Sequence, residues 1–287
     1  MEVKLAEYAG FCFGVKRAVD TVYAQLNTGK KIYTYGPIVH NDEVVNELCE
    51  KGVIVLETKE DLIALTPLEC ENAAVIIRAH GVPESIYQLL EDKGLECVDA
   101  TCPFVKRIHN IVRQKSEEGY HIVIIGNAGH PEVEGIVGWC IHGATVLEKP
   151  EEAEGFSASL DEKICIVSQT TFNYNKFKLM VEIFENKGYN VNVVNTICSA
   201  TEERQRSAQK LAAEADVMIV IGGKHSSNTT KLFEICQSEC ANTYFIQTLD
   251  DLHLELPKAV RLVGITAGAS TPNKLIEEGQ NYVRINF

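Results

Sequence analysis

The chain has 287 residues, of which 45 % are hydrophobic and 23 % charged, and its formal net charge is −13. This composition is typical of a globular protein with a sizeable core, and the length suggests two or three domains. The acidic balance argues against nucleic acid and anionic membranes as partners, because non-specific binding to either requires a basic surface. It does not exclude a small anionic ligand held by local donors.

Charged residues at Glu2, Lys4 and Glu7 interrupt the start of the chain, where a secretion signal needs an apolar segment. No window reaches the roughly 18 apolar residues of a membrane span. We therefore expect a cytoplasmic protein whose thiols are reduced. The 10 cysteines are too few for a disulfide scaffold, which needs roughly 8–10 %. Some of them could be ligands.

Short apolar, β-branched runs alternate with segments of helical spacing along the chain. The runs predict strands over residues 31–36, 73–81, 95–100, 121–127, 163–170, 189–196, 216–223, 242–248 and 260–268. The segments predict helices over residues 15–27, 85–94, 175–188 and 201–215, and the acidic stretch 148–155 predicts a solvated connection. The alternation predicts an α/β fold with mostly parallel sheets covered by helices.

Three cysteines recur in the same context, each just before a predicted helix. Cys102 follows Cys12 by 90 residues, and Cys198 follows Cys102 by 96. A polar loop comes 28 residues after each cysteine, and a second polar loop comes 40 to 44 residues after the first. The first loops carry His40, His130 and Ser226, and the second loops carry His80, Thr170 and Ser270.

This recurrent order predicts three pseudo-repeated α/β units of about 90 residues. The expected units are 14–102, with 1–13 supplying the first cysteine, then 103–198 and 199–287. Ligands of open parallel sheets bind beyond the carboxyl ends of the strands, and all six polar loops follow predicted strands. Three units around a pseudo-threefold axis would turn the cysteines and these loops toward one central cavity.

Three thiolates on separate units suit zinc or an iron–sulfur cluster, and each of these cysteines lies at a predicted helix N-terminus. Three protein ligands leave a fourth position open, which is typical of a catalytic metal site. The other seven cysteines are interpreted as packing residues. Of these, Cys97 and Cys165 lie inside predicted strands, Cys236 and Cys240 share a helix, and Cys49, Cys70 and Cys140 have no counterpart in the repeats.

The polar loops offer donors that could hold a phosphate group. Glu132 is the carboxylate beside a loop histidine, so it could relay protons, or it could be an exposed first-turn residue that stabilises its helix. Glu134, two residues on, should point elsewhere. No Walker or dinucleotide-binding glycine loop is present, which argues against ATP and NAD. The remaining histidines are interpreted as structural: His109, His121, His142, His225 and His253.

Nine motifs carry a resemblance that runs from Cys12 to Ser270. They are GFCFGVKRAV, GPIVHN, RAHGVP, DATCPFV, GHPEVEG, QTT, NTICSATEERQ, GGKHSSNT and AGAST. In this order they resemble the 4-hydroxy-3-methylbut-2-enyl diphosphate reductase family, which acts last in the methylerythritol phosphate route to isoprenoids. The resemblance implies an oxidoreductase with three α/β units in a trefoil around a 4Fe-4S iron–sulfur cluster.

The resemblance also implies residue roles. Cys12, Cys102 and Cys198 would hold three irons and leave the fourth for the substrate hydroxyl. The diphosphate would be bound by His40, His80, His130, Ser226, Ser227, Asn228 and Ser270. The catalytic residues would be Glu132, Thr170 and His130, which lies near the diphosphate and near the reacting allyl group. SSNTTKLFEIC, which contains three of the diphosphate residues, is equally typical of a capped helix start.

The implied reaction is a two-electron reductive dehydroxylation that gives isopentenyl and dimethylallyl diphosphates. Its electrons would come from an external ferredoxin or flavodoxin, for which we expect a local basic docking patch, and the chain is expected to be a monomer. Two other classes stay open: a redox-neutral iron–sulfur hydro-lyase, and a non-catalytic metal or redox sensor.

Overall fold

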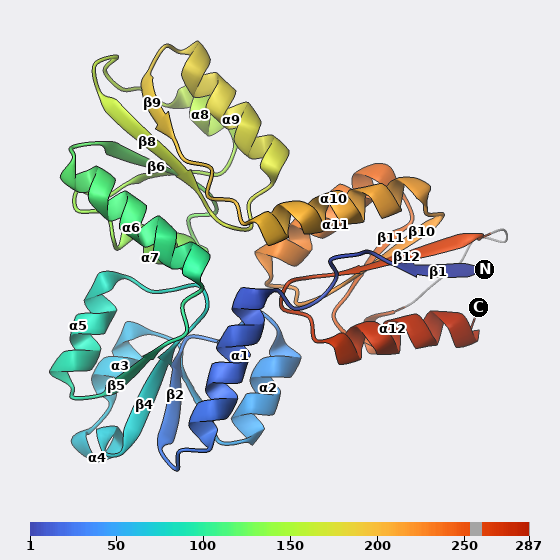
Figure 1. The fold of residues 1–287 in the computed structure, drawn as a ribbon, viewed down its shortest axis with the longest axis horizontal. Coiled ribbons are helices and arrows are strands. Elements are labelled where there is room, and N and C mark those ends of the chain that lie inside the picture. The colour runs from blue at the N-terminus through green and yellow to red at the C-terminus, as the bar shows by residue number, and fades with distance from the viewer. Residues whose placement is uncertain (253–259, 287) are drawn as a thin grey trace. The chain divides into compact units, whose positions relative to one another are not determined.

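The computed structural model describes residues 1–252 and 260–286. Within these residues the strands form three four-stranded sheets, in which every pair of neighbouring strands is parallel (Figure 1). The strand orders are β1-β12-β10-β11, β3-β2-β4-β5 and β7-β6-β8-β9. The predicted α/β fold with parallel sheets is confirmed.

The chain divides into two compact units. The first contains Met1–Lys16, His40–Asn46 and the residues from Cys198 onward, and the second contains Arg17–Val39 and Glu47–Ile197. The boundary between them falls inside two helices, α1 (Phe13–Leu26) and α2 (Asp42–Glu50). The division into three repeats of about 90 residues stays a prediction.

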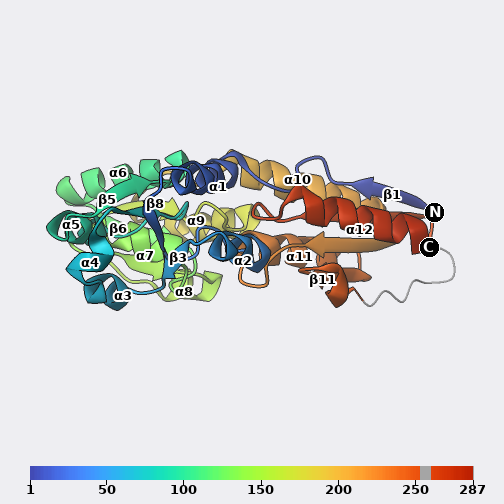
Figure 2. The same ribbon diagram turned by 90° about the horizontal axis from the view of Figure 1, so that it is seen from below.

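The first unit contains one sheet with helices on both faces. Its strands are β1 (Glu2–Leu5), β10 (Val217–Ile221), β11 (Thr243–Ile246) and β12 (Leu262–Ala267). Its helices are α10 (Ser199–Glu214), α11 (Ser227–Glu239), α12 (Asn273–Asn286) and the 3-10 turn η1 (Leu249–Asp251). Leu211 of α10 and Leu232 of α11 pack in one core cluster, and Ile276 of α12 packs in the other. Figure 2 shows α12 beside β1, with which it is in contact.

The second unit contains the other two sheets. The first has β2 (Lys31–Tyr35), β3 (Ile54–Leu56), β4 (Ala73–Ile77) and β5 (Glu96–Asp99), with α3 (Lys59–Ala64), α4 (Pro67–Cys70) and α5 (Glu84–Asp92). The second has β6 (His121–Ile125), β7 (Thr145–Leu147), β8 (Lys163–Ser168) and β9 (Asn190–Val193). Its helices are α6 (Pro103–Glu117), α7 (Pro131–Val137), α8 (Pro150–Gly155) and α9 (Tyr174–Asn186). Alternate residues of the buried strands face opposite core clusters, as their continuous apolar sequences require.

All nine predicted strands and all four predicted helices are confirmed. The stretch 148–155 is largely exposed, as predicted, but it is not an irregular connection, because α8 forms there. Pro150 opens this helix, Ala153 is its buried residue, and the Glu152 carboxylate accepts a hydrogen bond from the main-chain N–H of Lys149 at 3.2 Å. This acidic segment can form a helix because the Glu152 side chain caps the first turn. Three short strands at sheet edges, β1, β3 and β7, are not among the predicted strands.

Two cysteines do not fit the interpretation as packing residues. Cys97 and Cys49 are exposed, whereas Cys165, Cys236 and Cys240 are buried. Cys97 lies in β5, an edge strand that pairs only with β4 in the described sheet, so its position inside a strand does not bury it. No helix among the described residues is both long and apolar enough to cross a membrane. His253 lies outside the described residues.

A buried histidine joins three segments of the second unit. His109 of α6 is 3 % exposed, and its ring stacks on Trp139 with centroids 5.1 Å apart. Trp139 Nε1 donates to the carbonyl of Val82 at 2.9 Å, in the loop after β4. Gly81 is required in that loop, because its φ is +71° and an added Cβ would lie 2.6 Å from the His109 ring.

Burial lowers the pKa of His109 to about 4. The unfolded chain therefore binds a proton near pH 6.5 that the native state does not, so stability falls as the pH drops from about 6.5 toward 4. His109→Phe keeps an aromatic ring on Trp139 and removes this proton. We expect urea unfolding to show that, between pH 7 and 4.5, the variant loses on the order of 2 kcal/mol less than the wild type. Equal losses would contradict this account.

Candidate active site

The polar residues predicted from the repeat stand at the carboxyl ends of the central strands in all three sheets. Each first-loop residue comes five positions after a strand end: His40 after Tyr35, His130 after Ile125, and Ser226 after Ile221. The second-loop residues come two or three positions after the neighbouring strand: His80 after Ile77, Thr170 after Ser168, and Ser270 after Ala267. The placement of all six loops beyond strand ends is confirmed. Such loops are where parallel sheets bind ligands.

The three cysteines of the repeat occupy equivalent positions, each as the residue before a helix. The main-chain carbonyl of Cys12 accepts from the N–H of Lys16 at 2.9 Å, and that of Cys102 accepts from Lys106 at 3.0 Å. The carbonyl of Cys198 accepts from Glu202 at 3.0 Å. All three cysteines are partly exposed. The positive end of a helix dipole lies at each thiol, which suits a ligand that carries negative charge.

Cys12 and Cys198 belong to the first unit, and a buried arginine there faces both of them. Arg204 of α10 is 4 % exposed, and its Nη2 donates to the carbonyl of Gly10 at 2.7 Å. Burial lowers the pKa of Arg204, while the charges of Cys12 and Cys198 act to raise it. A buried cation beside two thiols offsets the negative charge of a thiolate-bound group. The donor set therefore fits a soft metal or an iron–sulfur cluster.

The first unit also holds most of the predicted phosphate donors. Ser226 precedes α11, and its Oγ accepts the N–H of Thr229 at 3.3 Å, so the interpretation of this segment as a capped helix start is confirmed. Asn228 is 3 % exposed, and neither polar atom of its side chain has a hydrogen-bond partner among the described residues. A buried amide without partners is costly, which points to a polar ligand that satisfies it.

Three backbone segments pack closely around the start of α11. The Ser270 Oγ donates to the carbonyl of His40 at 3.0 Å. An added Cβ at Gly223 would lie 2.4 Å from that same His40 oxygen, and one at Gly268 would lie 2.1 Å from the Oγ1 of Thr229. Glycines therefore let the loops after β10 and β12 approach this helix N-terminus. A helix N-terminus surrounded by neutral donors is suited to a phosphate group.

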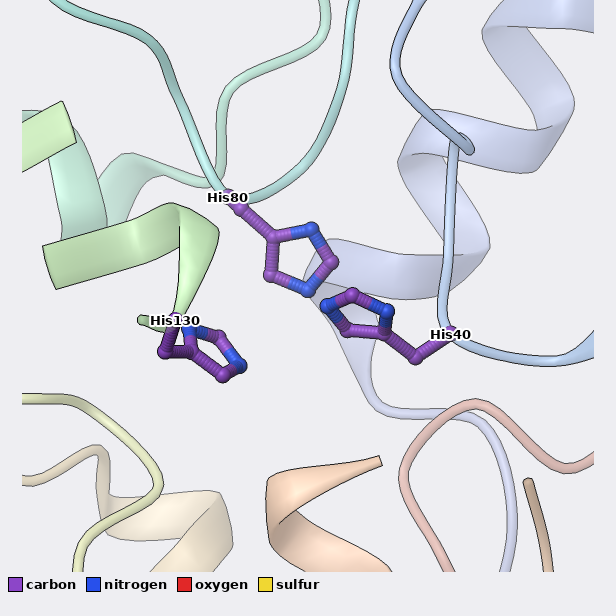
Figure 3. A group of neighbouring side chains, drawn as sticks. All are labelled: His40, His80 and His130. Carbon is purple, nitrogen blue, oxygen red and sulfur yellow. The ribbon is translucent and has the colours of Figure 1, made fainter. Parts of the chain in front are cut away.

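In the second unit, His80 and His130 lie edge to face, with ring centroids 5.5 Å apart (Figure 3). His130 precedes α7, and its Nδ1 accepts the N–H of Glu132 at 3.1 Å, which places the proton of the neutral ring on Nε2. His40, which is also drawn in Figure 3, belongs to the first unit and comes from the loop before α2.

Glu132 and Thr170 form a buried pair in the second unit. Glu132 is 2 % exposed, and its two carboxylate oxygens accept the main-chain N–H of Thr170 at 2.6 Å and its Oγ1 hydroxyl at 2.7 Å. Burial raises the pKa of Glu132 to about 7, although the hydrogen bonds from Thr170 act to lower it. The interpretation of Glu132 as an exposed first-turn residue is wrong, whereas Glu134 is exposed as expected. A carboxyl group that titrates near neutral pH is suited to general acid catalysis.

Arg204 contributes to this site but is not among the residues predicted from the sequence. It lies six residues after Cys198, and Arg17 lies five residues after Cys12. An arginine that recurs five or six residues after a repeat cysteine is the sequence signal that could have identified it.

Helix-covered parallel sheets, with thiols and a buried acid in their strand-end loops, are typical of α/β enzymes. Residues 3–284 match the family model described as LytB protein. A curated relative from Caldanaerobacter subterraneus subsp. tengcongensis is 48 % identical over 97 % of this chain and 95 % of its own length. One from Clostridioides difficile is 44 % identical over 97 % of both chains. Both are named 4-hydroxy-3-methylbut-2-enyl diphosphate reductase.

Solved structures agree with the curated relatives. The E-1-hydroxy-2-methyl-but-2-enyl-4-diphosphate reductase from Plasmodium falciparum matches with a TM-score of 0.92 and 31 % identity, over 99 % of this chain and 88 % of that one. A structure described as (E)-4-hydroxy-3-methyl-but-2-enyl diphosphate reductase, the terminal enzyme of the non-mevalonate pathway, matches with a TM-score of 0.68 and 43 % identity, over 98 % of both chains. The chain belongs to the LytB family and is a reductase. The resemblance drawn from its motifs is confirmed.

The raised pKa of Glu132 has a measurable effect on stability. Because the native pKa of about 7 lies above the ordinary glutamate pKa of 4.5, the unfolded chain loses its proton first, and wild-type stability falls as the pH rises through this window. Glu132→Gln cannot ionise, so its free energy of unfolding relative to the wild type should rise by about 2–3 kcal/mol between pH 4 and pH 8. Urea unfolding at the two pH values measures this. A difference that does not change with pH would contradict the assigned pKa.

Proposed function

We propose that this chain reduces (E)-4-hydroxy-3-methylbut-2-enyl diphosphate to isopentenyl and dimethylallyl diphosphates, the terminal step of the methylerythritol phosphate (non-mevalonate) pathway. In this reaction two electrons and two protons are consumed, the carbon–hydroxyl bond breaks, a carbon–hydrogen bond forms, and the oxygen leaves as water. Membership of the LytB family supports the substrate class. The observation that carries the proposal is the buried Glu132–Thr170 pair, since removal of a hydroxyl group as water requires a nearby acid.

The cofactor we propose is a 4Fe-4S cluster with Cys12, Cys102 and Cys198 as its ligands. Three partly exposed thiols at helix N-termini, with a buried arginine beside two of them, fit this group. When bound, the cluster supplies electrons one at a time and a Lewis-acidic iron without a cysteine ligand. The electrons come from an external carrier of the ferredoxin or flavodoxin type.

The diphosphate is held by the donors around the start of α11. Ser226, Ser227 and Asn228 stand at its N-terminus, and Ser270 and His40 are supplied by the loops that pack against it. Asn228 gains the hydrogen bonds that it lacks, which gives it a direct role in affinity. His80 and His130 complete the set from the second unit. Neutral hydroxyl, amide and main-chain donors hold the anion without requiring a basic surface.

Glu132 is the proposed proton source, and Thr170 is the residue through which it acts. The Thr170 hydroxyl bonds to the Glu132 carboxyl at 2.7 Å, so it can orient the substrate hydroxyl while it stays in contact with the acid. Desolvation keeps a large fraction of Glu132 protonated at neutral pH. His130, with its proton on Nε2, donates toward the substrate. A cytoplasmic monomer, and a basic patch for the electron carrier, complete the proposal as predictions.

A requirement for electrons separates this function from that of a redox-neutral hydro-lyase. Anaerobically purified protein should convert the hydroxylated diphosphate only when a reduced donor such as dithionite with a viologen dye is added. Product analysis should then show both isopentenyl and dimethylallyl diphosphates. Turnover without a reductant would favour the hydro-lyase, and a cluster-loaded chain that leaves the diphosphate intact would favour a sensor.

Glu132→Gln tests the proton role. Since positioned acids contribute roughly 10²–10⁴-fold, kcat should fall at least about 100-fold, while KM and cluster content stay close to the wild-type values. Wild-type kcat should decline as the pH rises through about 7, because the protonated form of Glu132 is depleted. Glu134→Gln, an exposed carboxylate on the same helix, is the matched control and should retain full activity. Equal activity of the two variants would refute the role.

A further inference from the structure

The main chain just before Cys102 is held by an arginine from another helix. Arg17 of α1 donates from Nη1 to the carbonyls of Ala100 at 3.2 Å and Thr101 at 2.9 Å. Its Nη2 donates to the carbonyl of Asp99 at 3.2 Å. One guanidinium thus donates to the three consecutive carbonyls that immediately precede Cys102. A planar fork with several N–H groups can do this, whereas an ammonium group cannot reproduce its geometry.

The segment before Cys12 is held by a single hydrogen bond from Arg204. Its Nη2 donates at 2.7 Å to the carbonyl of Gly10, two residues before the cysteine. Gly10 has φ of +92°, and an added Cβ would lie 2.9 Å from the Cδ1 of Ile276. The chain therefore makes a tight turn at a position that favours glycine, and a nearly fully buried guanidinium binds the outer side of that turn.

Both segments are short connections between a strand and a helix, so few of their main-chain groups belong to a regular ladder. The Cys102 N–H donates to the carbonyl of Ala79 at 3.0 Å, and the Cys12 N–H donates to that of Ala269 at 3.2 Å. The carbonyls of Asp99, Ala100 and Thr101 accept hydrogen bonds from Arg17, and the carbonyl of Gly10 accepts one from Arg204. A buried carbonyl without such a partner would be free to turn toward water and take the cysteine with it.

The two arginines occupy related places in the repeat. Arg17 lies on the helix that follows Cys12, and Arg204 lies on the helix that follows Cys198. Each arginine therefore stands on the helix of one cysteine and binds the segment that leads to another: Arg17 serves Cys102, and Arg204 serves Cys12. Arg17 makes its contacts within the second unit and Arg204 within the first, and the two arginines bind different numbers of carbonyls.

We propose that Arg17 and Arg204 are positioning residues for the cysteine ligands, each fixing the peptide segment that places one thiol. The proposal rests on the proposed function in so far as the ligand group is an iron–sulfur cluster. Loss of groups that orient metal ligands typically costs 10–100-fold in affinity. We expect each substitution to weaken cluster retention by a similar factor. The local change in structure should be confined to the segment that the missing arginine holds.

Hydrogen–deuterium exchange on the full, anaerobically purified chain tests the local part of this proposal. In Arg17→Leu, amide exchange in the segment 99–102 should become at least about 10-fold faster, with 9–12 unchanged; Arg204→Leu should show the reverse. Arg113→Leu and Arg206→Leu are matched controls, because both remove exposed arginines that pair with a glutamate of the surface. The amides of β6 and β8 report global stability. Unchanged exchange in the target segments, or equal acceleration in β6 and β8, would overturn the proposal.

Cluster retention tests the consequence. The rate at which a chelator removes iron should rise 10–100-fold in both leucine variants and stay at the wild-type value in the two controls. Arg17→Lys and Arg204→Lys keep the charge without the fork, so they should restore only part of the retention. Faster local exchange with unchanged retention, or full rescue by lysine, would overturn the positioning role. Absence of iron and sulfide from the wild-type chain would instead refute the proposed cofactor. The exchange experiment would then still test whether the two arginines hold these segments.

Discussion

The candidate site depends on one constraint, that every pair of neighbouring strands in the described sheets is parallel. Parallel strands place all their carboxyl ends at one edge, and the helix that follows each strand begins at the same edge. Main-chain N–H groups and the positive ends of helix dipoles therefore gather where the strand-end loops lie. Cys12, Cys102, Cys198, Ser226 and His130 all stand immediately before a helix, so the fold gives each of them the same electrostatic setting.

This setting explains how a chain with a net charge of −13 can bind an anion. The donors at the start of α11 are hydroxyl, amide and main-chain groups, and none of them adds a formal charge. Glu132 is the carboxyl group buried among the proposed catalytic residues, and burial raises its pKa to about 7. In the proposed function, this burial serves the acid chemistry.

The sequence predicts the sheets and the strand-end loops well, because both depend on local signals: apolar runs, and cysteines and loops that recur at a fixed offset. It does not predict what depends on contacts between distant residues. The buried Glu132 carboxylate accepts hydrogen bonds from Thr170, 38 residues away, and Arg204 donates to the carbonyl of Gly10, 194 residues away. Cys97 is exposed because β5 is an edge strand. The position of a strand at the edge is set by the strand order of the sheet, which the residues of that strand alone do not reveal.

We propose that Cys12, Cys102 and Cys198 bind one iron–sulfur cluster. Iron and sulfide analysis of anaerobically purified protein tests it most directly, with wild type, Cys102→Ser and the exposed Cys49→Ser compared in one preparation. We expect about four iron and about four sulfide per chain in the wild type and Cys49→Ser, and loss of both in Cys102→Ser. Stoichiometric zinc without sulfide, or a full cluster in Cys102→Ser, would contradict it.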